Sequence, residues 1–160
     1  MQINPERDIM LDRFLQAPPA LVWRCWTEPD LFHQWYLPKP WHASNAVLDL
    51  RPGGRFSFQV NGPEGDASQA EGSFLEVIPE RKLVFTDLFG PDYAPFEMPD
   101  SNLGPNFNAI LTFASEGSGT RYRAVARHRN AKDAAMNKEM GFEAGWAMTA
   151  DQLEALAVTL

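Results

Sequence analysis

The alternation of apolar and polar positions is most regular in the last thirty residues, 131–160. Apolar residues, with one threonine among them, recur there every three or four positions: Phe142, Trp146, Thr149, Leu153, Leu156 and Leu160. This spacing predicts one long α-helix whose apolar face packs against a broad apolar surface. Gly141 and Gly145 lie inside the predicted helix, where each glycine costs about 1 kcal/mol relative to alanine. They indicate either close backbone packing, or room for a ligand or a bend.

Before residue 130, short segments of alternating apolar and polar residues predict β-strands. The clearest is 55–61, with the sequence RFSFQVN. The predicted strands are 8–16, 41–50, 55–61, 70–78, 82–89, 106–115 and 119–129. Residues 20–36 have helical spacing and are divided near 27–30, which predicts two short helices. One strand, two helices, six strands and a final helix predict an α+β fold in which an antiparallel sheet packs on that helix.

The last predicted strand has two different faces, because successive side chains of a strand point to opposite sides. One face carries four arginines: Arg121, Arg123, Arg127 and Arg129. The other carries Tyr122, Ala124, Ala126 and His128. We expect the arginine face to be exposed, and the opposite face to lie under a helix or beside a cavity.

Residues 90–105 do not fit a central strand, because they contain four prolines: Pro91, Pro95, Pro99 and Pro105. A connection of this length is long for a compact domain. We interpret it as either a lid over a functional site or a mobile connection.

Composition and charge limit the classes of protein to which this chain can belong. A chain of 160 residues predicts a single domain, residues 1–160, which can bury a core without disulfides. The one cysteine, Cys25, lies beside two tryptophans and predicts a buried side chain in a cytoplasmic protein. The net charge of −7 argues against nucleic acid and anionic membranes as partners. No apolar run reaches about 18 residues and the N-terminus lacks a signal-peptide core, so membrane insertion is not expected.

Several segments of the chain resemble a known family. They are VWRCWTEPDLFHQWY, DLRPGGRF, EGSFLEVIPERKLVFTD, GTRYRAVARH and MGFEAGW, and the resemblance covers nearly the whole chain. The family is the activator of heat-shock-protein-90 ATPase homologue family, in the START-like, birch-allergen-like (SRPBCC) superfamily that includes polyketide cyclases. The resemblance implies a helix-grip fold: a curved seven-stranded antiparallel sheet wrapped around a long C-terminal helix, with two short helices after the first strand. Bacterial members often carry histidines around the MGF segment, at positions where this chain has Asn137 and Glu143.

A START-like fold implies a cavity between the sheet and the long helix. The candidate wall residues are aromatic: Phe56, Phe58, Phe74, Phe85, Phe107, Tyr122 and Trp146. The alternative is that they fill a solid core. His128 and Asp87 share strand faces with these aromatics and are the candidate polar end of a ligand site. Together with Arg13, they could form a structural network, orient a ligand, or act as acid and base.

No motif for a metal or a cofactor is present. The three histidines lack metal-ligand spacing, and no helix follows the Gly53-Gly54 turn to bind a phosphate. The serines occur in no nucleophile-elbow motif. We therefore expect no metal and no cofactor, and we assign no catalytic residue.

The favoured function is binding of a small apolar molecule in the cavity. The first alternative is an enzyme of the cyclase or dehydratase kind, which would use inward-facing His128 and Asp87. The second comes from the family name: a chaperone-interacting module that binds through its outer surface. Both a monomer and a homodimer remain open.

Overall fold

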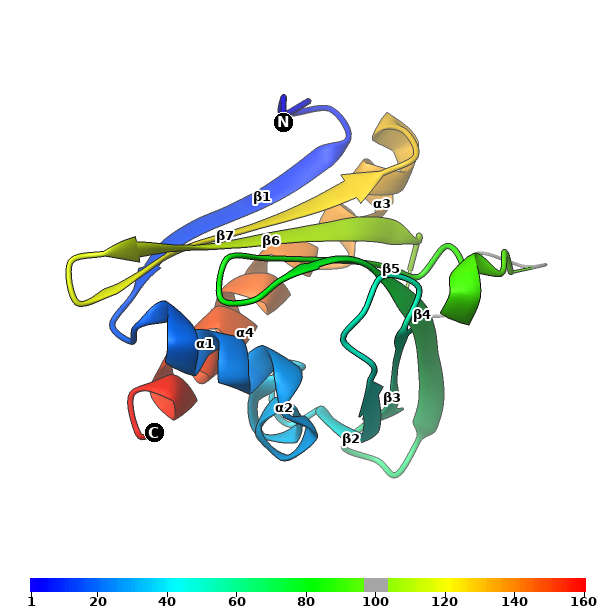
Figure 1. The fold of residues 1–160 in the computed structure, drawn as a ribbon. Helices are drawn as coiled ribbons and strands as arrows, with labels where there is room; N and C mark the ends of the chain where they lie inside the picture. The colour runs from blue at the N-terminus through cyan, green and yellow to red at the C-terminus, as the bar shows by residue number, and fades with distance from the viewer. Residues whose placement is uncertain (97–103) are drawn as a thin grey trace.

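The computed structural model describes residues 1–96 and 104–160 and has the helix-grip α+β architecture (Figure 1). In chain order the elements are β1 (Asp8–Leu15), α1 (Pro19–Thr27), α2 (Pro29–Trp35), β2 (His42–Leu48), β3 (Arg55–Asn61), β4 (Ala67–Ile78), β5 (Lys82–Thr86), the 3-10 turn η1 (Pro91–Tyr93), β6 (Phe107–Glu116), β7 (Gly119–His128), α3 (Ala131–Glu139) and α4 (Phe142–Ala157).

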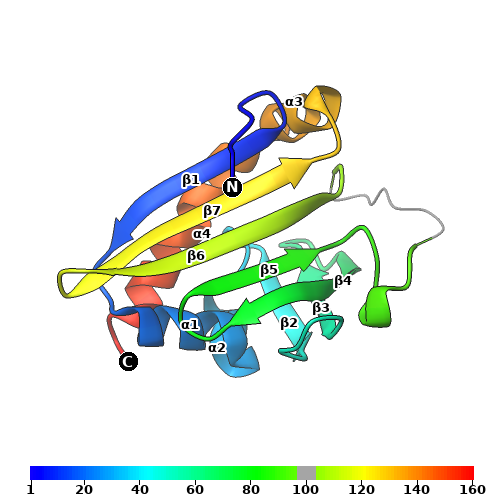
Figure 2. The ribbon, with the colours of Figure 1, turned by 45° about the horizontal axis from the view of Figure 1, so that its top comes forward.

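The seven strands form one antiparallel sheet in the order β1-β7-β6-β5-β4-β3-β2. Figures 1 and 2 show α1, α2 and α4 on the same side of this curved sheet, so these helices cover one of its faces. The fold predicted from the sequence is therefore confirmed. The strand predicted at 82–89 is shorter than expected and ends at Thr86.

Strand β7 has the two faces that the sequence predicts. Arg121 and Arg123 are exposed, whereas the opposite face is buried along its whole length: Tyr122, Ala124, Ala126 and His128. Arg127 differs from the expectation, because it is half-buried and donates two hydrogen bonds to the buried carboxylate of Asp8 on β1. These bonds hold the pKa of Asp8 below its ordinary value.

The single helix predicted for residues 131–160 is wrong, because the structure has two helices there. Gly141 adopts a left-handed conformation, with φ of 83°, which an L side chain rarely adopts. A glycine in this conformation directly after a helix is a common way to end it. The bend interpretation of Gly141 is therefore correct. The predicted apolar face also ends early, because Leu160 lies beyond α4 and is 42% exposed.

Helices α1 and α2 close one end of the sheet with a cluster of aromatic rings. Trp26 contacts Trp35, with ring centroids 4.8 Å apart, and the Trp35 indole donates a hydrogen bond to the carbonyl of Cys25. Phe32 is fully buried and packs edge-to-face against Phe58 of β3. Burial raises the pKa of the Cys25 thiol to about 11, so this cysteine is a neutral core residue rather than a nucleophile.

Strand β2 forms one edge of the sheet and contains a bulge. Its register with β3 shifts between Ser44 and Val47, and Asn45 within the bulge has a positive φ of 52°. The backbone N–H of Ala46 donates to His33 Nε2 of α2 at 3.0 Å, which attaches this edge to the helix beneath it.

The long connection between β5 and β6 is described only in part. Residues 91–93 form η1, and Phe89 pairs with Pro95 in an isolated bridge. The two interpretations of 90–105, a lid or a mobile connection, depend in part on residues 97–103, which are outside the described residues.

Candidate functional site

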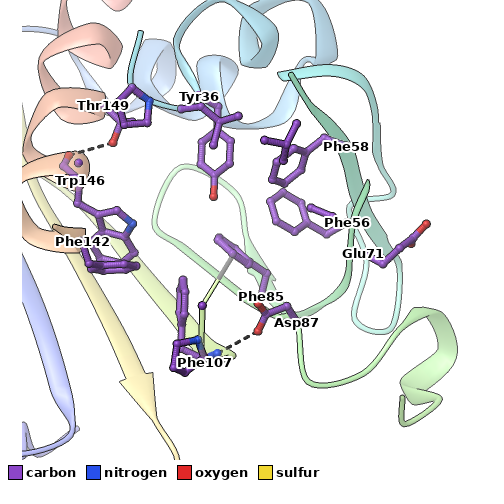
Figure 3. A pocket seen from close by; sticks show the side chains of 17 residues that line it. Tyr36, Phe56, Phe58, Glu71, Phe85, Asp87, Phe107, Phe142, Trp146 and Thr149 are labelled. Carbon is purple, nitrogen blue, oxygen red and sulfur yellow. Dashed lines mark hydrogen bonds between the residues drawn. The ribbon is translucent and has the colours of Figure 1, made fainter. Parts of the chain in front are cut away.

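A cavity of about 310 Å³ lies between the sheet and α4 (Figure 3). Its described lining is mostly apolar and comes from β3 to β6, α4 and the segment after α2: Tyr36, Leu37, Pro38, Phe56, Phe58, Val60, Ala70, Glu71, Phe85, Asp87, Gly104, Pro105, Phe107, Phe142, Gly145, Trp146 and Thr149. Small-molecule sites usually have ~300–1,000 Å³, so this cavity is at the lower end of that range.

The sheet wall follows from strand alternation. Phe56, Phe58 and Val60 are alternate residues of β3, and all three face the cavity. Phe85 of β5 reaches the same region, with its ring centroid 4.3 Å from that of Phe56. The rings of Phe56 and Phe85 thus meet across the intervening strand β4, which contributes Ala70 and Glu71 to the lining.

The helix wall comes from the first half of α4. Phe142, Gly145, Trp146 and Thr149 are spaced by three, one and three residues, so they share one helix face. A Cβ atom at Gly145 would meet only Pro38 Cγ, at 3.6 Å, which is an ordinary contact. The structure therefore favours the interpretation that Gly145 leaves room, because no backbone packs closely against it.

The rim segment after α2 is attached to α4 by one side chain. Gln152 donates hydrogen bonds to the carbonyls of Trp35 and Leu37, at 2.7 and 2.8 Å. Its Oε1 accepts a third bond, from the backbone N–H of Lys39 at 3.0 Å. These three bonds position Tyr36, Leu37 and Pro38 at the cavity, although Leu37 has an unfavourable positive φ of 86°.

Replacing Gln152 with alanine should therefore destabilise the protein by about 1–3 kcal/mol, because three backbone groups lose their partner. The Gln152→Glu variant is the matched control, because a carboxylate keeps the acceptor for Lys39 but loses both donors. Urea unfolding measures the stability, and hydrogen exchange at Lys39 reports the acceptor: its amide should exchange faster in the alanine variant than in the glutamate variant. Equal stability of wild type and Gln152→Ala would show that water replaces these bonds at no cost.

Asp87 is the polar group of the inner wall. It follows the end of β5, and its Oδ1 accepts a hydrogen bond from the backbone N–H of Phe107 at 2.9 Å. Burial raises the pKa of Asp87 to about 6, and the hydrogen bond from Phe107 only partly offsets this effect. The Tyr36 hydroxyl points into the same cavity (Figure 3). Burial is the main reason that the pKa of Tyr36 is raised, and the Asp87 carboxylate adds to it.

Six of the nine residues proposed from the sequence line this cavity: Phe56, Phe58, Phe85, Asp87, Phe107 and Trp146. Phe74 does not, because it is fully buried behind Phe56, with ring centroids 5.2 Å apart. Tyr122 borders a separate small cavity of about 20 Å³, which has space for about one water molecule. The buried indole nitrogen of Trp26 borders the same space and has no hydrogen-bond partner among the described residues. Burial raises the pKa of the Tyr122 hydroxyl, and the nearby Trp26 indole only partly offsets this effect.

His128 faces inward as expected but does not line the cavity. Its Nε2 contacts the side-chain nitrogen of Asn137 at 2.7 Å, and its Nδ1 contacts the carbonyl oxygen of Arg7 at 3.1 Å. The two partners fit a neutral ring that accepts at Nε2 and donates at Nδ1. Burial accordingly lowers the pKa of His128. Of the three roles considered for His128, these contacts favour a structural hydrogen-bond network over ligand orientation or acid–base catalysis.

Arg13 also has a structural contact rather than a place at the cavity. Its guanidinium donates to the carbonyl of Ala147 and to the carboxylate of Asp151, both on α4. It therefore joins β1 to the long helix.

The lining also contains residues that the sequence-based list missed. Tyr36, Leu37 and Pro38 follow a helix, and their position depends on a contact more than 100 residues away in the chain. Phe142 and Thr149 were in the predicted helix face, so the helical spacing already contained the signal for them. Among residues 1–96 and 104–160, no three His, Cys, Asp or Glu side chains gather closely enough to hold a metal ion. None of the described helices is long and apolar enough to cross a membrane.

Comparison with known proteins identifies the family of this fold. The model of the family described as Activator of Hsp90 ATPase homolog 1-like protein matches residues 16–157. A crystal structure of a protein from Nitrosomonas europaea is 40% identical, with a TM-score of 0.91, over 98% of this chain and 97% of that one.

More distant structures share the fold at lower identity. A protein from Arthrobacter aurescens is 19% identical, with a TM-score of 0.83 over 100% of this chain and 91% of its own. An AHSA1-like protein from Aeromonas hydrophila is 21% identical, with a TM-score of 0.70 over 95% and 92%. No curated protein shows a significant match. The match over residues 16–157 and the 40% identical structure show that this chain belongs to the family of Activator of Hsp90 ATPase homolog 1-like proteins.

Proposed function

We propose that this protein binds a small apolar molecule in the cavity between its sheet and α4. The observation that carries the proposal is the cavity itself: about 310 Å³, with seven aromatic residues in its described lining. Water is a poor occupant of such a space, because apolar walls are poorly solvated, and an apolar ligand that displaces the water gains free energy. The glycine at position 145 supports the proposal, because a larger residue there would occupy part of this space.

The catalytic alternative has less support. Acid–base catalysis by a histidine and a carboxylate would need His128 and Asp87 at one site, and His128 is held by Arg7 and Asn137 away from the cavity lining. A chaperone-interacting role rests on the description of the family alone.

The test is the binding of a neutral apolar fluorophore, N-phenyl-1-naphthylamine, to a matched pair of variants. Gly145→Leu should fill the cavity from α4 and weaken binding about tenfold or more, while a leucine in a helix keeps the protein folded. Gly145→Ala adds a single methyl group and should weaken binding much less, with a gain in stability of about 1 kcal/mol. Circular dichroism and urea unfolding confirm that both variants are folded. No binding to wild type, or equal binding to Gly145→Leu, would contradict the proposal.

A further inference from the structure

The charged residues around the cavity are all acidic. Of the described lining residues only Asp87 and Glu71 carry a charge, and none is lysine, arginine or histidine. Residues 97–103, outside the described part, also contain no basic residue by sequence. Glu71 is neutralised, because Arg55 Nη1 donates to both of its oxygens at 3.0 and 3.1 Å. Its carboxylate also points away from the cavity in Figure 3, so Asp87 is the charge that a ligand would meet.

Asp87 has a backbone donor but, within residues 1–96 and 104–160, no cation paired with it. The N–H of Phe107 donates to Oδ1, and in the described part of the chain no lysine, arginine or histidine forms an ion pair with this carboxylate. Burial raises the pKa of Asp87 to about 6, so the group is mostly ionised at neutral pH. Asp87 is half-buried, and a carboxylate partly removed from water without a positive partner is unfavourable, so a cation brought by a ligand would reduce that cost.

The aromatic walls add a second attraction for positive charge. Aromatic ring faces attract ammonium groups within ~6 Å of the ring centroid. Rings of Phe56 and Phe85 form the wall next to Asp87, and Phe107 provides both a ring and the backbone donor. The Tyr36 hydroxyl, directed into the cavity, can accept a hydrogen bond from an ammonium group. The same surroundings disfavour an anion, because it would place a like charge near Asp87.

We infer that the cavity selects an apolar molecule that carries a protonated amine, with the nitrogen beside Asp87 and the apolar body among the aromatic rings. This inference rests on the proposed function, since it assumes that the cavity binds a small molecule. It excludes fatty acids and other apolar carboxylates as preferred ligands.

Three probes with the same naphthalene ring test the inference by calorimetry at pH 7.5. They are 1-naphthalenemethylamine, 1-naphthalenemethanol and 1-naphthoic acid, which end in an ammonium, a hydroxyl and a carboxylate group. The amine should bind about 10- to 100-fold more tightly than the alcohol, because a hydrogen bond between charged groups adds that much, and the acid should bind most weakly.

The Asp87→Asn variant should reduce the affinity for the amine to that for the alcohol. Asp30→Asn, an exposed position on α2 outside the cavity, is the matched control and should keep the full preference. In wild type the preference should shrink as the pH falls through about 6, because Asp87 becomes protonated. The other titratable groups of the described lining are Glu71, which is paired with Arg55, and Tyr36, whose raised pKa keeps it protonated throughout.

The possible results separate the two proposals. If the alcohol or the neutral fluorophore binds but the amine binds no better, the inference is overturned and the proposed function stands. The inference is also overturned, and the proposed function again stands, if the amine still binds more tightly than the alcohol both in Asp87→Asn and in wild type below pH 6. If neither the fluorophore nor any of the three probes binds, both proposals fail.

Discussion

Replacing Leu153 with alanine is expected to cost about 2–5 kcal/mol of stability, whereas the larger change Trp146→Ala should cost less than about 2 kcal/mol. Both residues lie on the same face of α4. Leu153 is fully buried in the main core, so its removal leaves a cavity that neighbours cannot fill. Trp146 is only half-buried and borders a space that already exists, so its removal mainly enlarges that space.

Urea unfolding of the two variants checks this order, and the fluorophore provides an independent measurement. Leu153→Ala should lose stability but keep its affinity in the folded state. Trp146→Ala should lose affinity for the fluorophore, because Trp146 lines the cavity and its ring centroid lies 4.6 Å from that of Phe142. A greater loss of stability in Trp146→Ala than in Leu153→Ala would mean that the space beside Trp146 is packed like a core.

The Asp87→Asn variant should be more stable than wild type at neutral pH, by about 3 kcal/mol at most. The pKa of Asp87 is about 6 in the folded protein against an ordinary value of 3.8 for an aspartate, and each pKa unit corresponds to about 1.4 kcal/mol. Because the folded pKa is raised, the folded state binds this proton more tightly than the unfolded state. The contribution of Asp87 therefore favours folding most below about pH 4, and it is lost as the pH rises to about 6.

The stability gain of Asp87→Asn over wild type should thus grow by about 2 kcal/mol between pH 4.5 and 7.5. Asparagine can still accept the hydrogen bond from Phe107, so the variant isolates the charge. Asp87→Leu is the companion variant. Its stability relative to wild type should rise with pH by the same amount, but at every pH it should be less stable than Asp87→Asn, because the Phe107 N–H loses its acceptor. A gain that stays constant between pH 4.5 and 7.5 would show that Asp87 is not desolvated. If the gain appears, the wild-type carboxylate is retained at the expense of stability, as is common at functional sites.

Strand positions could be predicted from the sequence because alternation has a short period and needs no distant information. Strand β3, Arg55–Asn61, has the predicted bounds, and the buried face of β7 is the predicted one. The sequence predicts one helix with a bend at Gly141 only as an alternative, because the spacing from Phe142 onward resembles a continuation of the preceding helix. The signal was nevertheless present: Lys138 lies in the last turn of α3 and a glycine follows shortly after, which is typical of a helix end.

From the sequence, the candidate site could be located only to one face of the sheet. The alternation of side chains along a strand correctly predicts that Asp87 and His128 face inward, but it does not tell which helix covers each of them. Asn137 of α3 and the carbonyl of Arg7 enclose His128, whereas the space in front of Asp87 stays open. This difference depends on where α3 ends and α4 begins. The contribution of Tyr36 depends on the contacts of Gln152, which no local pattern contains.

The bulge in β2 bears on the solubility of the folded protein. An edge strand offers unpaired backbone groups to any other strand, so a regular edge is a template for aggregation. In β2 the register shift bends the edge, and the N–H of Ala46 is already bonded to His33 of α2. An incoming strand would lose that donor and would meet an irregular backbone, which opposes edge-to-edge pairing between copies of this chain. The contact between His33 and Ala46 thus does more than attach a helix: it protects an edge that the open sheet leaves uncovered.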